Sequence, residues 1–166
     1  MSTPILVQDF FELGDKTALV CGEPGVVEGT WKTLKELGHK IHFTNDIDDA
    51  IERIRYTQYN CVIVQEELLG KSLEENEVMQ YLATQPMSQR RNTFVALIGD
   101  SCRTLDAIQA FSLSVHVVIN PSDLPNLTAI LKKSIAEYER NYRIYRIVLD
   151  AARGERRAVP RQETQA

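Results

Sequence analysis

The sequence TALVCGEPGVVEGTWKTLKELGHKIHF, residues 17–43, decides the fold. It begins with an apolar run that is closed by Gly22, Pro24 and Gly25, a pattern typical of a buried strand followed by a turn. In residues 26–37 apolar side chains recur every three or four positions, as on one face of a helix, and Gly38 ends that pattern. Residues 40–43 (KIHF) are typical of a second strand. We therefore predict a strand–helix–strand unit.

The same alternation continues along the chain. Asn45 or Asp46 is expected to cap a second helix, a third is predicted from residue 78 to Pro86, and a short fourth over residues 105–111. Three further apolar runs are predicted strands: residues 60–65, 94–98 and 115–119. Continuous apolar strands that alternate with amphipathic helices indicate a parallel sheet covered on both faces. The predicted fold class is therefore α/β, with a flavodoxin-like, doubly wound five-stranded sheet of order 2-1-3-4-5.

Composition suits one domain. The chain has 166 residues, of which 43% are hydrophobic and 25% charged, enough to bury a core of its own. No apolar run approaches the ~18 residues of a membrane helix, and the N-terminus lacks the features of a signal peptide. We therefore expect a cytoplasmic protein with no membrane partner. Cys21, Cys61 and Cys102 form no CxxC motif and are expected to be buried and reduced.

The last amphipathic pattern is long. It is expected to be capped by Ser122 or Asp123 and to run from near Leu124 to Gly154, about 29 residues or roughly 43 Å. Residues 1–131 carry a net charge of −8 (10 basic, 18 acidic), whereas residues 132–166 carry +4 (9 basic, 5 acidic). The apolar residues of this predicted last helix recur three and four positions apart: Leu124, Leu127, Leu131, Ile135, Tyr138, Tyr142, Tyr145 and Leu149.

The predicted strands end in chemically distinctive groups. They end in Cys21-Gly22-Glu23-Pro24, Gln65-Glu66-Glu67, Gly99-Asp100 and Asn120-Pro121. In this order and spacing, residues 16–138 resemble the receiver domain of bacterial response regulators. The most specific similarities are Glu23-Pro24 with the helix that ends at Gly38, residues 76–100 as third helix and fourth strand, and Asn120-Pro121 after the fifth strand.

The resemblance implies a site that this sequence has lost. A working receiver has a phosphate-accepting Asp after strand three, two Mg²⁺-binding carboxylates after strand one, a Thr or Ser after strand four, a Lys after strand five and a switch aromatic within strand five. The corresponding residues of this chain are Gln65, the pair Cys21 and Gly22, Gly99, Asn120 and Val117. The expectation is a pseudo-receiver without cofactor or metal. A one-residue slip would bring in Glu66 and Glu23, but it would turn Glu66 to the other face of the sheet.

The crevice at the strand ends leaves alternatives open. A small-ligand sensor would use Cys21, Gly22, Gln65 and Asn120 as hydrogen-bonding lining, with Glu23, Glu66 and Asp100 at the rim. Dinucleotide binding at Gly22, Gly25 and Gly29 is disfavoured, because the spacing matches no phosphate-binding loop. His39, His42 and His116 lie at no metal-ligand spacing and are expected to be ordinary core-edge or surface residues.

The resemblance also divides the chain into four parts. These are an N-terminal segment (1–15), the receiver-like domain (16–138), an extension of the last helix (139–153) and a flexible tail (154–166). The extension is expected to pair with a second copy through Leu131, Ile135, Tyr138, Tyr142, Tyr145 and Leu149; the alternative is that it folds back on its own domain, near residues 5–13. Arg140, Arg143 and Arg146 would also be compatible with nucleic-acid binding. The acidic character of residues 1–131 and the absence of a nucleic-acid-binding motif disfavour that function.

The expected function follows from a receiver-like fold in which the residues of the phosphorylation site are replaced. It is a non-enzymatic, phosphorylation-independent signalling or scaffold module that acts through protein–protein contacts with itself, as a homodimer, and with a further signalling protein. The ligand sensor is the alternative. An enzyme is disfavoured because the strand ends offer no acid–base pair and no activated nucleophile.

Overall fold

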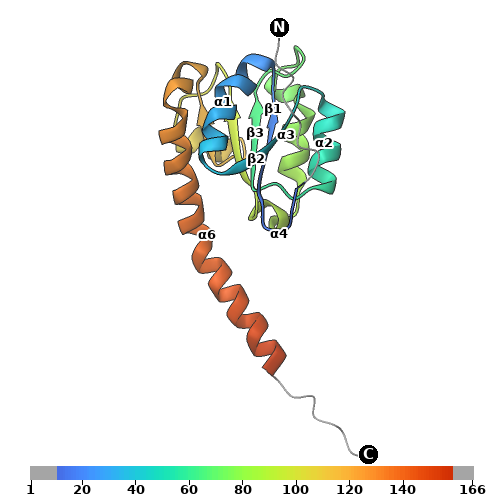
Figure 1. Ribbon diagram of the computed structural model, residues 1–166, viewed down its shortest axis with the longest axis vertical. Coiled ribbons are helices and arrows are strands. Elements are labelled where there is room, and N and C mark those ends of the chain that lie inside the picture. Colours follow the sequence, from blue (N-terminus) through green and yellow to red (C-terminus); the bar gives the residue numbers. More distant parts are fainter. Residues whose placement is uncertain (1–10, 159–166) are drawn as a thin grey trace, which may run out of the picture.

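The computed structural model describes the backbone of residues 11–158 and the side chains of residues 11–154 (Figure 1). Its centre is a five-stranded parallel sheet of order β2-β1-β3-β4-β5, which confirms the predicted fold class. The strands are β1 (Lys16–Cys21), β2 (His39–Thr44), β3 (Cys61–Gln65), β4 (Phe94–Ile98) and β5 (Val117–Ile119).

Helices connect and cover these strands. The α-helices are α1 (Pro24–Glu36), α2 (Ile47–Tyr56), α3 (Glu77–Thr84), α4 (Met87–Arg90), α5 (Ala107–Ser112) and α6 (Leu127–Ala158), and the 3-10 turns are η1 (Leu73–Glu75) and η2 (Pro121–Asn126). The single turn α4 follows Pro86 and was not predicted. Gly38, at φ +81°, ends α1 as expected, because glycine adopts this left-handed conformation without strain.

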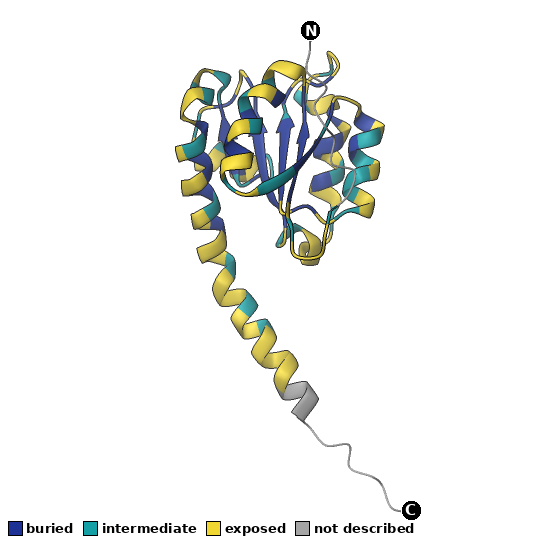
Figure 2. Ribbon diagram, in the orientation of Figure 1, coloured by how far each residue is buried: buried dark blue, intermediate teal, exposed yellow. Residues whose placement is uncertain are grey.

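The core has two halves, one on each face of the sheet (Figure 2). Along β1, Leu19 and Cys21 pack among residues of α2, α3 and α5, whereas Ala18 and Val20 pack against α1 and α6. This alternation is the two-residue period of a strand. Both faces are apolar because both are covered, which is why the strands appear as continuous hydrophobic runs in the sequence.

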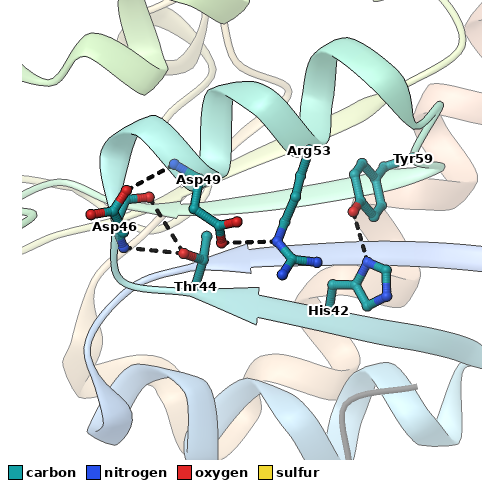
Figure 3. A network of polar contacts seen from close by, with 6 residues as sticks. All are labelled: His42, Thr44, Asp46, Asp49, Arg53 and Tyr59. Carbon is teal, nitrogen blue, oxygen red and sulfur yellow. Dashed lines mark hydrogen bonds and ion pairs between the residues drawn. The ribbon is translucent and has the colours of Figure 1, made fainter. Parts of the chain in front are cut away.

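A network of polar contacts holds α2 against the edge strand β2 (Figure 3). Asp46 is the N-cap, since its Oδ1 accepts from the backbone N–H of Asp49 at 2.8 Å. Burial acts to raise the pKa of Asp49, but hydrogen bonds from Arg53 (2.8 Å) and Thr44 hold that pKa below its usual value. The confirmed cap fixes the direction in which α2 leaves the sheet.

The fifth strand is shorter than predicted and begins at Val117 rather than at residue 115. The backbone N–H of Val95 donates to the side-chain Nδ1 of His116 at 2.9 Å, while the N–H of His116 donates to the carbonyl of Val95 at 2.8 Å. The side chain of His116 thus accepts a hydrogen bond that a backbone carbonyl would accept in a regular β-sheet.

The boundaries of the last helix also differ from the prediction. Its α-helical part begins at Leu127, because η2 precedes it with Pro125 inside the turn, and the cap is Asn120 rather than Ser122 or Asp123. The helix continues through Gly154 to Ala158. Residues 1–10 and 159–166 lie outside the described residues, so the expectations for most of the N-terminal segment and for the end of the tail stay predictions.

Beyond the domain, α6 continues past the end of the sheet at which the strands begin, and it does not fold back on the described part of the domain (Figures 1 and 2). Most residues of this projecting part are exposed. Within residues 11–158, no helix is both long enough and apolar enough to cross a membrane.

Candidate functional site

The carboxyl ends of the strands bring most of the predicted crevice residues together. Gly22 and Glu23 follow β1, Gln65 and Glu66 lie at the end of β3, and Gly99 follows β4. Two predicted members are not available to a ligand. Cys21 is fully buried in the core beside α2, and Val117 is buried in the core beside α1 and α6.

Gln65, which the sequence resemblance places where receivers have the phosphate-accepting Asp, binds the start of α1. Its Oε1 accepts from the backbone N–H of Glu23 at 2.7 Å. A Cβ on Gly22 would lie 3.0 Å from that oxygen, so the glycine leaves room for the amide. The side chain is a neutral acceptor that joins β3 to α1, and it offers no carboxylate for acyl phosphate formation.

Glu66 was predicted at the rim but is buried, with 8% of its surface exposed. Its carboxylate accepts from the backbone N–H of Ser101 at 3.1 Å and from the Ser101 hydroxyl. A Cβ on Gly99 would lie 2.0 Å from the Oε2 of Glu66. Glycine after β4 therefore makes room for the carboxylate, and Glu66 ties β3 to the loop that follows β4.

Asn120, at the position of the family's Lys, uses both ends of its amide within the chain. Its Nδ2 donates to the carbonyls of Asp100 (3.3 Å) and Cys102 (3.0 Å). Its Oδ1 accepts from the backbone N–H and the hydroxyl of Ser122. Glu23 and Asp100 are exposed, as predicted for the rim.

One buried residue that was not identified from the sequence, Asn76, holds the end of β3 and the start of α3 together. Asn76 is fully buried, and its Nδ2 donates to the carbonyls of Gln65 (3.0 Å) and Glu66 (3.2 Å). Its Oδ1 accepts from the N–H of Met79 as the N-cap of α3. An Asn just before an apolar helical run is the signal that could have identified this cap.

At the opposite end of the sheet, a cluster that we call the aromatic clamp holds α6. It consists of Phe94, His116, Tyr138 and Tyr142. The ring of His116 stacks on Phe94 at 5.4 Å between centroids and meets Tyr138 edge-on at 4.8 Å, and the hydroxyl of Tyr138 donates to the carbonyl of Arg91 at 2.5 Å. Burial lowers the pKa of His116 to about 4, and the charge of Arg90 acts in the same direction.

The clamp involves residues of the predicted interface. Leu131 and Tyr138 are buried in their own domain, and Ile135 and Tyr142 pack against the same core. Tyr145 lies under the guanidinium of Arg91, with 4.0 Å from its ring centroid to Cζ. The domain itself therefore covers Leu131, Ile135, Tyr138 and Tyr142, which leaves these four less available to a second copy, whereas dimerisation through the last helix stays a prediction.

Comparisons with known proteins agree with the geometry. No protein-family model matches the chain, and no curated protein matches it in sequence. Solved structures do match. A response regulator from Thermotoga maritima is 17% identical with a TM-score of 0.57, covering 74% of this chain and 98% of its own. A receiver domain protein from Methanospirillum hungatei JF-1 is 12% identical with a TM-score of 0.57 (76% and 98%).

A response regulator from Hahella chejuensis is 18% identical with a TM-score of 0.53, covering 77% of this chain and 94% of its own. The fold is that of a receiver domain. At these identities the similarity concerns the fold, and it covers about three quarters of the chain.

Elsewhere on the receiver-like domain, an open hollow lies between α2 and α3, with Ile51, Arg55, Tyr81 and Thr84 among its lining residues. It is separate from the strand-end crevice. No group of three or more His, Cys, Asp or Glu side chains within the described residues is arranged to hold a metal ion.

Proposed function

We propose that this chain is a phosphorylation-independent, receiver-like signalling or scaffold module that acts through protein–protein contacts. The observation that carries the proposal is the bond between Gln65 and the N–H of Glu23. At the position where a receiver accepts phosphate, this chain has an amide that serves as a structural link. The partner-binding element of the proposal is the projecting part of α6.

The surrounding groups support the same proposal. Glu66 and Asn120 each make hydrogen bonds to the loop after β4 or to the residues after β5. These bonds hold the loop in one arrangement without a phosphoryl group. A receiver that needs no phosphate to order this loop can present a constant surface to a partner.

The same bonds count against the ligand sensor. The amides of Gln65 and Asn120 were its expected recognition groups, and both are already bonded within the chain. A ligand would have to displace these bonds before it gained any of its own.

The test is incubation of the full chain with acetyl phosphate and Mg²⁺, followed by intact-mass spectrometry, with a phosphorylatable receiver domain as positive control. We expect no phosphoryl adduct. Glu66→Gln is the matched variant for the slipped arrangement. An acid-labile adduct on the original chain would overturn phosphorylation independence, and its loss in Glu66→Gln would place the phosphoryl group on Glu66.

A further inference from the structure

The projecting part of α6 carries an exposed apolar surface that we call the distal stripe. It consists of Ile144, Ile147, Val148 and Ala151, and the first three are 70%, 57% and 61% exposed. At about 100° per residue, Ile144, Ile147 and Ala151 lie about 120° to 180° around the helix from Tyr138, which faces the domain, and Val148 lies at the edge of the stripe, about 80° from Tyr138. The distal stripe is therefore distinct from the surface used by the aromatic clamp.

We propose that the distal stripe binds the distal stripe of a second copy of this chain, with the two α6 helices antiparallel. The inference deepens the proposed function, on which it rests, by naming the partner. Ile144 lies opposite the partner's Ile147, and Ile147 opposite the partner's Ile144, as two-fold symmetry requires. The next layers place Arg140 opposite the partner's Ala151, so that a small residue leaves room for a long side chain.

Charges beside the stripe favour this orientation. Arg143 and Asp150 are both exposed on the same flank, seven residues apart, and neither forms an ion pair among the described side chains. In the antiparallel pair, Arg143 lies within two residues, about 3 Å along the axis, of the partner's Asp150 on the same flank, and the symmetric contact repeats it. A shift by one heptad would instead bring Asp150 beside the partner's Asp150.

A parallel pair would be less favourable. In register, it would stack each Glu137 and each Arg140 on the same residue of the second helix, and like charges repel. It would also place Arg143 beside the partner's Val148, so the arginine would gain no opposite charge.

The domain leaves space for the antiparallel arrangement. The same side of α6 continues toward the domain through Lys133, Ala136, Glu137 and Arg140, and all four residues are exposed. The partner's distal helix can therefore lie along this side of α6 without displacing the aromatic clamp.

Cross-linking tests the orientation. The three native cysteines are buried, and burial raises the pKa of Cys21 and Cys61 to about 12 and that of Cys102 to about 11, so an introduced thiol is the reactive one. Under mild oxidation, a mixture of Arg140→Cys and Ala151→Cys chains is expected to give a mixed disulfide, while each variant alone gives little. Efficient cross-linking of each variant alone would show a parallel pair and overturn the proposal.

Sedimentation of the full chain from micromolar to millimolar concentration tests the dimer itself. Arg143→Asp is expected to weaken dimerisation about tenfold, and Arg143→Asp combined with Asp150→Arg to restore it. Arg153→Asp, an exposed charge on the side of the helix that faces away from the stripe, is the matched control and is expected to leave the dissociation constant unchanged. Ile147→Asp is expected to give a monomer with unaltered thermal unfolding.

Two results would overturn the proposal: a monomer at every concentration, or equal effects of Arg143→Asp and Arg153→Asp. Either result concerns the distal stripe alone. Failure of the proposed function would appear separately, as phosphoryl uptake at the crevice.

Discussion

Acidification from about pH 7.5 to about pH 5 is expected to destabilise the fold by about 2 kcal/mol through His116 alone. Burial lowers the pKa of this imidazole to about 4, whereas in the unfolded chain the pKa is close to 6.5. Below about pH 6.5 the unfolded chain takes up a proton that the folded chain does not, so stability falls with pH. The loss reaches about 3 kcal/mol near pH 4, where the folded imidazole also titrates.

Urea unfolding at several pH values, followed by circular dichroism, measures this loss. His116→Gln is the control, because its amide cannot take up the proton. The carboxylates add little in this range, since the pKa values of Asp15 and Asp49 are lowered and their contribution is lost only in stronger acid. If the free energy of unfolding of His116→Gln fell as steeply as that of the original chain, the reasoning would be refuted.

Three further substitutions test single contacts by urea unfolding. Gly99→Thr should cost at least about 2 kcal/mol, because its Cβ would clash with both the carboxylate and the Cβ of Glu66; the cost should shrink in a Glu66→Gly background, which removes both groups, and an unchanged cost would exclude the clash. Tyr138→Phe should cost about 1 kcal/mol through the lost bond to the carbonyl of Arg91, and no change would show that this bond contributes nothing net. Asp46→Ala should cost about 1 kcal/mol by removing the N-cap of α2, a larger loss than Asn45→Ala should give.

The fold could be predicted from the sequence because its main determinants are local. The apolar run at residues 17–21, the helical period up to Gly38 and the cap at Asp46 each depend on a few neighbouring residues. The start of β5 could not be predicted in this way. It depends on a hydrogen bond from Val95 to the side chain of His116, 21 positions away in the chain, and a hydrophobic pattern carries no information about such a bond.

The site was predictable as a set of positions but not as a set of contacts. The strand ends of a parallel sheet meet at one edge, so Gln65, Gly99 and Asn120 were expected together. The burial of Glu66 was not, because it depends on a missing Cβ at Gly99. The burial of Tyr138 in its own domain was not predicted for a related reason. A helical period shows that Tyr138 is on an apolar face, but not whether its own domain or a second chain covers that face.

The aromatic clamp anchors α6 at the start of β4 and β5, so a tilt of the helix would pivot about this point. Residues 143–158 extend roughly 24 Å beyond the clamp, so a tilt of about 10° there would move the tip by roughly 4 Å. Small changes in the packing of Phe94 and His116 are therefore amplified at the far end of the helix. The clamp lies at the end of the sheet opposite Gln65, so a tilt of α6 at the clamp would not require any movement in the strand-end crevice.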